Sequence, residues 1–153
     1  MTDIRRAVPG DAEAAAAVFT EARRGAGAAI PPAIHTSEED RWFVREVLIA
    51  QHETWVAVDG IEIVGIMALR DDWIDQLYVA PTAQGLGIGS RFVELAKQQR
   101  PGGLQLWTFE SNVPAQHFYE RLGFAVKERT DGANNEERAP EIRYVSSTLP
   151  WHP

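Results

Sequence analysis

The sequence has no cysteine, which excludes disulfide bonds, thiolate nucleophiles and cysteine-ligated zinc sites. Basic residues are also scarce, because 15 Lys and Arg stand against 22 Asp and Glu and give a formal net charge of −7. Nucleic-acid binding needs a basic surface, so we expect no nucleic-acid partner. The four histidines lack the spacing of metal ligands, and we expect no metal site; they are His35, His52, His117 and His152.

Long hydrophobic runs are absent as well. No apolar stretch is long enough to cross a bilayer, and the first residues lack the apolar centre of a signal peptide. These two absences predict a cytoplasmic protein without a membrane partner. The chain has 153 residues with a hydrophobic share of 44%, which is enough for one domain with a buried core. We expect the domain to cover residues 1–148 and a tail to cover 149–153.

The spacing of apolar residues and the positions of Gly and Pro predict an alternation of strands and helices. The predicted helices cover residues 12–24, a segment that begins at Thr36 or Ser37, and residues 87–99 and 112–122. The predicted strands cover residues 2–8, the two arms of a hairpin within 54–69, and residues 73–80, 104–109, 124–129 and 142–147. A strand, a glycine-rich loop, a helix and a strand follow one another from 73 to 109. This order predicts a crossover between parallel strands.

Two local details sharpen this prediction. The pair Asp59-Gly60 favours a two-residue hairpin turn of type I′. Phe43, Val47 and Ala50 recur at helical spacing, so we expect them to form one stripe of the second helix.

The stretch QGLGIGS, from Gln84 to Ser90, holds three glycines directly before a predicted helix. Glycine is costly inside a helix, so this density indicates that another group must approach the backbone closely. Backbone N–H groups at a helix start attract anions, and phosphate oxygens reach them where side chains are absent. The stretch therefore predicts a phosphate or pyrophosphate site. A flexible and tightly packed helix start is the alternative.

Two other phosphate-binding motifs fit this stretch poorly. A P-loop needs Gly-Lys-Ser/Thr, and the stretch has no lysine. A dinucleotide-binding fingerprint that starts at Gly85 needs glycine where Ser90 stands.

A second motif, NVPAQHFYERLGF, runs from Asn112 to Phe124 after the next predicted strand. Together the two motifs strongly resemble the GNAT superfamily of acetyl-CoA-dependent N-acetyltransferases. The first part of the family pattern is matched by Leu77, Val79, Pro81, Gln84, Gly87 and Gly89. The second part is matched by Asn112, Ala115, Phe118, Tyr119, Gly123 and Phe124. The close resemblance covers about residues 74–124.

The resemblance implies an α/β (α+β) fold with a single GNAT-like domain. Its sheet would be mixed, mostly antiparallel and twisted, with six to seven strands splayed at the centre and about four flanking helices. It also implies acetyl-CoA as the cosubstrate, no metal, and a homodimer as the assembly typical of the family. The implied cofactor-binding residues are Leu77, Tyr78, Val79, Gln84, Gly85, Leu86, Gly87, Ile88, Gly89, Ser90, Asn112, Phe118 and Tyr119. For Asn112, a helix N-cap is a compatible second role.

The chemistry that the resemblance implies is attack of a neutral amine on the acetyl thioester. The N–H of Val79 is the expected donor to the developing oxyanion, and Tyr119 is the expected acid for the departing thiolate. Ala115, Phe118, Tyr119 and Leu122 also form an apolar stripe at helical spacing. A purely structural tyrosine in the core is therefore the alternative for Tyr119.

The expected general base is Asp75. It lies on the strand before the glycine-rich stretch, and strand alternation places it on the same side as Leu77. Asp71, Asp72 and Glu110 are the alternatives among the side chains, and a chain of water molecules is another.

The resemblance places the acceptor pocket among residues 30–42, Trp73 and the polar loop 130–141. A solvated connector is the alternative for that loop, whose polar side chains include Asn134, Asn135, Glu136 and Glu137. The expected function is acetylation of a primary amine of a small molecule. Acetylation of a protein or peptide amine and a non-catalytic acyl-CoA-binding module are the alternatives.

Overall fold

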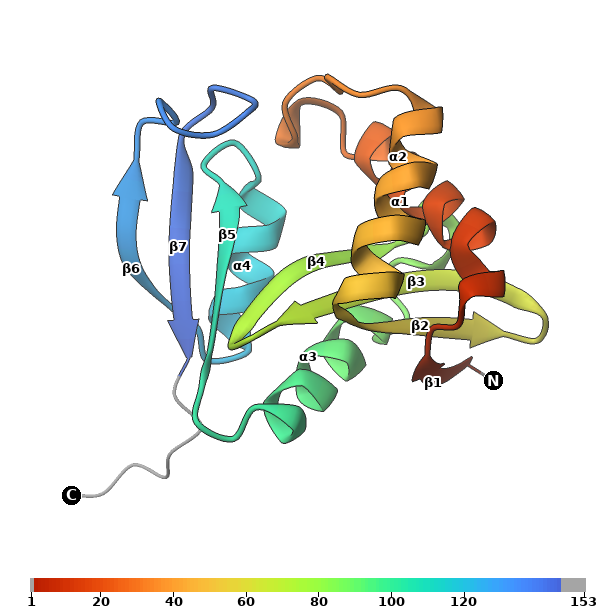
Figure 1. Cartoon of the computed structure of the whole chain (residues 1–153). Coiled ribbons are helices and arrows are strands. Elements are labelled where there is room, and N and C mark those ends of the chain that lie inside the picture. Colours follow the sequence, from red (N-terminus) through yellow and green to blue (C-terminus); the bar gives the residue numbers. More distant parts are fainter. Residues whose placement is uncertain (1, 147–153) are drawn as a thin grey trace.

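The computed structural model describes residues 2–146, and these form one sheet with helices on both faces (Figure 1). Seven strands lie in the order β1-β2-β3-β4-β5-β7-β6. Every neighbouring pair is antiparallel except β4 and β5, which are parallel. The strands are β1 (Thr2–Arg6), β2 (Glu53–Asp59), β3 (Glu62–Arg70), β4 (Trp73–Val79), β5 (Leu104–Phe109), β6 (Ala125–Thr130) and β7 (Glu141–Ser146). This sheet confirms the mixed, mostly antiparallel fold that the sequence predicts.

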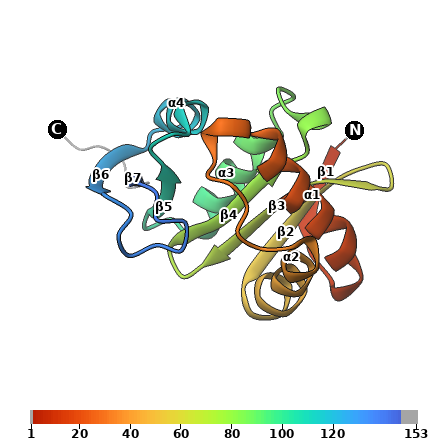
Figure 2. The same cartoon turned by 90° about the horizontal axis from the view of Figure 1, so that it is seen from above.

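The helices form two layers, with α1 and α2 on one face of the sheet and α3 and α4 on the other (Figures 1 and 2). Their bounds are α1 (Ala12–Gly25), α2 (Ser37–Phe43), α3 (Ile88–Gln99) and α4 (Val113–Arg121). Helix α2 begins with a capping box, because the Thr36 hydroxyl accepts from the Glu39 N–H at 3.1 Å and the Glu39 carboxylate accepts from the Thr36 N–H at 2.9 Å. Both layers bury apolar side chains against the sheet.

The buried face of the second helix differs from the predicted stripe. After Phe43 the helix continues as a π-helix from Val44 to Ile49. The wider turn rotates the side chains, so that Val44 and Leu48 are fully buried while Ala50 is exposed. The predicted stripe of Phe43, Val47 and Ala50 is therefore not the face that this helix buries.

The hairpin turn lies one residue later than predicted. Asp59 still pairs with Glu62, so the two turn residues are Gly60 and Ile61. The φ angle of Gly60 is +66°, whereas Ile61 is not among the residues with positive φ. This pattern is that of a type II′ turn, which needs glycine at its first central position.

Two predictions concern the end of the chain. The last predicted strand is found from Glu141 to Ser146, and residue 147 lies outside the described residues. The predicted tail at 149–153 also lies outside them, so the domain boundary at 148 stays a prediction.

Candidate active site

The sheet opens between β4 and β5. Their pairing is confined to one position, Trp73 with Gln105. Beyond this position the two strands diverge, as Figure 1 shows. The opening leaves a gap at the centre of the sheet, with one edge of β4 facing it.

The backbone of β4 offers hydrogen-bonding groups to this gap. The Ala80 N–H donates to the Val64 carbonyl at 2.8 Å. Hydrogen-bonded pairs alternate along an antiparallel ladder, so Tyr78 bonds to β3 while Leu77 and Val79 direct their N–H and C=O groups toward the gap. The Val79 carbonyl accepts a hydrogen bond of 3.0 Å from the Gln84 side chain. Leu77 and Val79 therefore form the exposed edge, whereas Tyr78 belongs to the site through its side chain.

The glycine-rich stretch follows β4 and ends in the first turn of α3. Gly87 is the N-cap residue of this helix, with φ at +82°. The N–H groups of Ile88, Gly89 and Ser90 have no partner within the helix because they lie in its first turn. A Cβ atom added at Gly85 or Gly87 would meet nothing within 4 Å. Other residues in this stretch are placed differently, since Leu86 is exposed and Ile88 is buried.

Helix α4 borders the same stretch from the other side of the gap. A Cβ atom at Gly89 would lie 3.1 Å from the Phe118 ring, so α3 and α4 approach closely there. Asn112 caps α4, because its side-chain oxygen accepts from the Ala115 N–H at 3.2 Å. The structure thus brings together the glycine stretch, Phe118 and the edge of β4 around one opening.

Tyr119 lies on α4, and 8% of its surface is exposed. Its ring packs edge-on against Phe118 and Phe124, at centroid distances of 5.0 and 5.5 Å. Burial raises the pKa of the Tyr119 hydroxyl well above its usual value, and Tyr78 adds to the shift. The phenol therefore stays protonated at physiological pH. The contacts of the ring show that Tyr119 packs in the core. This packing agrees with the alternative role of a structural tyrosine, which the apolar stripe of α4 suggested.

Asp75 occupies a β-bulge in β4. Ile74 pairs with Leu69 and Gln76 pairs with Ala68, so Asp75 is the extra residue. Its carboxylate lies 3.8 Å from His52 Nδ1 and 3.5 Å from an Arg70 guanidinium nitrogen. The bulge breaks the regular alternation that the sequence analysis assumed.

The alternatives to Asp75 lie at the ends of strands and are exposed. Asp72 accepts two hydrogen bonds from the Gln105 side chain, at 3.0 and 3.2 Å. Asp71 stands beside it in the β3–β4 turn, and Glu110 directly follows β5. The role of Asp75 as the base stays a prediction.

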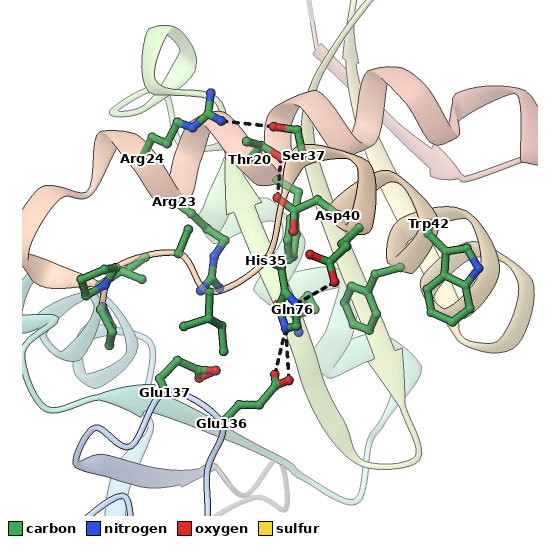
Figure 3. Close-up of a pocket in the computed structure, with 18 of the residues that line it drawn as sticks. Thr20, Arg23, Arg24, His35, Ser37, Asp40, Trp42, Gln76, Glu136 and Glu137 are labelled. Atoms are coloured by element: carbon green, nitrogen blue, oxygen red, sulfur yellow. Dashed lines mark hydrogen bonds and ion pairs between the residues drawn. The ribbon is translucent and has the colours of Figure 1, made fainter.

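A cavity of about 700 Å³ opens on the side of the sheet that α1 covers. It lies between α1, the segment leading into α2, and the β6–β7 loop (Figure 3). The cavity includes most of the predicted segment 30–42 together with Glu136 and Glu137. It is lined by Phe19, Thr20, Arg23, Arg24, Gly27, Ile30, Pro31, Pro32, Ala33, Ile34, His35, Ser37, Glu39, Asp40, Trp42, Phe43, Gln76, Glu136 and Glu137.

Three predicted acceptor residues do not line this cavity. Trp73 stacks on Trp107 instead, with ring centroids 6.4 Å apart. Asn135 braces its own loop by donating to the Ala139 carbonyl at 2.7 Å and to Glu141 at 2.8 Å, and Asn134 is exposed beside it.

The sequence analysis missed the contribution of α1 to the cavity. Phe19 and Arg23 stand one helical turn apart and both face β4, where the Arg23 guanidinium donates to the Tyr78 hydroxyl at 2.9 Å. Their spacing is the only signal in the sequence, and any helix that packs on a sheet shows it.

Within residues 2–146, no group of three or more His, Asp or Glu side chains is arranged to hold a metal ion. No helix in the same range is both long enough and apolar enough to cross a membrane.

The sheet is split between two parallel strands, and a helix with a glycine-rich start lies beside the split. This arrangement is that of the acetyltransferases that the sequence resembles. Residues 50–126 match the family model described as the acetyltransferase (GNAT) domain, and the chain belongs to this family. Members of the family use acetyl-CoA. The matched range contains β4, the glycine stretch and α4.

Two curated relatives match about half of the chain. The peptidyl-lysine N-acetyltransferase YjaB of Salmonella typhimurium is 41% identical over 78 residues, which cover 50% of this chain and 53% of the relative. The peptidyl-lysine N-acetyltransferase YiaC of Escherichia coli is 29% identical over 84 residues, which cover 54% of this chain and 57% of the relative. The chain therefore spans about half the length of the curated relatives it matches.

The similarity of fold extends further than the similarity of sequence. The solution structure of the apo form of YjaB from Escherichia coli superposes with a TM-score of 0.77 and 25% identity, over 95% of this chain and 97% of that one.

Proposed function

We propose that this chain transfers an acetyl group from acetyl-CoA to a primary amine by direct attack within a ternary complex. The observation that carries the proposal is the edge of β4 that faces the gap and, beyond Trp73, pairs with no neighbouring strand among residues 2–146. At one end, that edge leads to the first turn of α3, where the glycines leave the backbone uncovered. The cavity lies on the face of β4 that α1 covers. An extended ligand with amide groups fits the edge as an added strand. Its pyrophosphate fits the helix start, where the positions of the missing side chains at Gly85 and Gly87 are open.

The backbone of β4 would serve both binding and chemistry. Leu77 and Val79 direct their N–H and C=O groups into the gap and would hold the pantetheine amides. The N–H of Val79 would then donate to the carbonyl oxygen as negative charge develops on it. When bound, acetyl-CoA supplies the thioester that the amine attacks.

Tyr119 would supply the proton that the departing thiolate needs. Its raised pKa keeps the hydroxyl protonated, so the donor is ready at every physiological pH. The same burial would destabilise a thiolate beside it, which favours transfer of the proton to sulfur.

Asp75 is the proposed base, acting through water because it does not line the cavity. Its carboxylate lies within 4 Å of nitrogen atoms of His52 and Arg70, which fix its position in the bulge.

For the acceptor, we propose the side-chain amine of a protein lysine. The support is that the two relatives named above are peptidyl-lysine N-acetyltransferases. A small-molecule amine is the second candidate. A cavity of about 700 Å³ has the size typical of small-ligand sites.

The test has two stages. Calorimetry with acetyl-CoA measures whether the cosubstrate binds, and a thiol-release assay then measures turnover with a panel of lysine peptides, free amino acids and other small amines. We expect binding and turnover with at least one lysine acceptor. Binding without turnover on any amine would favour the acyl-CoA-binding module, and the absence of binding would overturn the proposal.

A further inference from the structure

The side chain of Arg23 enters the cavity from the last turns of α1 (Figure 3). One guanidinium N–H donates to the Tyr78 hydroxyl at 2.9 Å. The guanidinium carbon also lies 5.6 Å from the centroid of the Phe19 ring and 5.9 Å from that of the Tyr78 ring. Two aromatic rings and a hydroxyl therefore hold this cation in a fixed place beside β4.

The other basic side chains that line the cavity already have polar partners there. His35 lies 3.1 Å from a Glu136 carboxylate oxygen and 3.6 Å from one of Glu39. Arg24 is exposed and donates to the Ser37 hydroxyl at 3.1 Å. Arg23 is half-buried, and its hydrogen-bond partner is a neutral hydroxyl.

Within residues 2–146, Arg23 takes part in no ion pair. A guanidinium has five N–H donors in a planar fork that matches a carboxylate. One donor bonds to Tyr78, so several remain to bind a ligand in the cavity. The apolar side chains of Ile30 and Phe43 line the same cavity and would strengthen such a charge-assisted bond by excluding water.

We propose that Arg23 binds a carboxylate of the acetyl acceptor, so that the favoured acceptors are amines with a carboxylate nearby. The inference rests on the proposed function, because it names a property of the acceptor. A singly charged carboxylate suits the site better than a doubly charged phosphate, because Glu136 and Glu137 line the opposite side (Figure 3).

The carboxylate has two sources. It belongs to the acceptor itself in an amino acid, or to an acidic side chain next to the lysine in a peptide. Arg23 lies outside the matched family range of residues 50–126, as do all the lining residues of the cavity except Gln76. The preference is therefore a property of this chain's own α1 and loops.

The experiment compares pairs of acceptors in which one member has a free carboxylate and the other the corresponding amide. The pairs are glycine and glycinamide, Nα-acetyl-lysine and its amide, and a short blocked peptide with Lys-Glu against the same peptide with Lys-Gln. Calorimetry measures the binding of each acceptor to the protein saturated with coenzyme A, and thiol release measures kcat/KM with acetyl-CoA. Each measurement is made for the natural protein, Arg23→Gln and Arg24→Gln. The Arg24 variant is the matched control, because it removes the same charge from the next residue of the helix.

We expect at least one pair to show roughly a tenfold preference for the carboxylate form in the natural protein. The preference should vanish in Arg23→Gln and persist in Arg24→Gln. The ratio within a pair is insensitive to general damage to the fold, which lowers both members alike. The peptide pair reports an acidic neighbour, and the other two pairs report a carboxylate of the acceptor itself.

Two results would overturn the inference: no carboxylate preference in any pair, or a preference that survives in Arg23→Gln. Turnover of the amines without such a preference would leave the proposed acetyltransferase function intact. Preferential binding of the carboxylate forms without turnover would instead support the Arg23 site and contradict the catalytic proposal.

Discussion

The three glycines between Gln84 and Ser90 are required for different reasons. Gly85 and Gly87 both have φ at +82°, a conformation that side chains disfavour, and the space beside each is open. Gly89 lies within α3, where a Cβ would press against the Phe118 ring. The sequence shows three equivalent residues, whereas the structure assigns two to the shape of the loop and one to the contact between helices.

Replacing Gly87 by valine tests the anion site. A β-branched residue at this φ should lower the free energy of unfolding by about 1–2 kcal/mol. Its side chain should also block the space above the N–H groups of the first turn and weaken acetyl-CoA binding by roughly tenfold or more. Thermal unfolding and calorimetry measure the two effects. Gly102→Val is the control, since Gly102 is exposed, does not have positive φ and has open space around its Cβ position. Unchanged affinity in Gly87→Val would argue against the site.

Replacing Tyr119 by phenylalanine tests the proton donor. The hydroxyl makes no hydrogen bond with residues 2–146, so its removal should change stability little. The value of kcat should fall about a hundredfold, as expected for loss of a general acid, while the affinity for acetyl-CoA stays the same. Steady-state kinetics and calorimetry give the two quantities. Because the pKa of Tyr119 is raised, a decline of activity with pH below about 10 must come from another group. Full turnover in the variant would leave Tyr119 with a role in the core only.

Some residues of the site could be predicted from the sequence because they belong to motifs with a backbone function. The glycines and Asn112 are of this kind, because Gly85 and Gly87 adopt a positive φ and Asn112 caps α4. Arg23 could not be predicted, because it is an ordinary cation near the end of a helix. Its proposed role depends on the fold, in which β4 places the Tyr78 hydroxyl against it.

At the scale of the elements, the sequence predicted where most helices and strands lie. It did not predict the geometry of one helix and of one hairpin turn. Helix α2 begins at the capping box of Thr36, and α4 is followed by Gly123, whose φ is +93°. The π-helix after Phe43 and the displaced turn at Gly60 were not predicted. A helical period of 3.6 residues does not indicate a π-helix, and glycine is compatible with both turn types.

The loops on the two sides of the cavity are joined by a single histidine. His35 precedes α2, and Glu136 lies in the β6–β7 loop, 3.1 Å away. Glu136, followed by Glu39, raises the pKa of His35 above the usual 6.5. The raised pKa extends the pH range in which the imidazolium links the loops, and the link is lost as the pH rises through that pKa.

NMR titration of the His35 ring measures this link. We expect a pKa above 6.5 in the natural protein and a lower value in Glu136→Gln, because the variant removes the principal carboxylate. Glu38→Gln is the control, as Glu38 lies on α2 near His35 but is not among the causes of its shift. Equal titration of His35 in all three proteins would show that the loops are not joined by this ion pair.

For the whole molecule, the tyrosines predict how stability depends on alkaline pH. The chain has three, and all have a raised pKa. Burial is the main cause for each, and the pKa of Tyr144, whose hydroxyl donates to Glu120 at 2.6 Å, is raised to about 12. Unfolded phenols lose their protons near pH 10, so above that pH the unfolded chain binds fewer protons than the folded one.

The free energy of unfolding should therefore fall as the pH rises above about 10, by as much as about 4 kcal/mol per pH unit while all three phenols remain protonated in the fold. Denaturant unfolding at a series of pH values measures the slope. Ultraviolet absorbance of tyrosinate gives an independent check, because the folded protein should show no tyrosine with an ordinary titration. A group that ionises near pH 10 without unfolding would contradict the burial of these side chains.

The overall architecture could be predicted because the two motifs identify a family whose sheet order is fixed. The parallel neighbours β4 and β5 follow from the crossover between residues 73 and 109. Of the cavity walls, the segment 30–42 and the loop 130–141 could be predicted, whereas the wall from α1 could not. The position of the Trp73 side chain could not be predicted, since its stacking on Trp107 depends on how β4 meets β5. The bulge at Asp75 is likewise invisible in the alternation of residues.

Since β4 and β5 are paired at one position alone, the seven strands divide into two smaller sheets that meet at that position. A ligand lying along Leu77 and Val79 would add hydrogen bonds to the free edge of one of them. The acyl donor would thus complete the architecture before it takes part in any reaction, and the side of the protein that meets the acceptor would gain its final shape when the donor arrives.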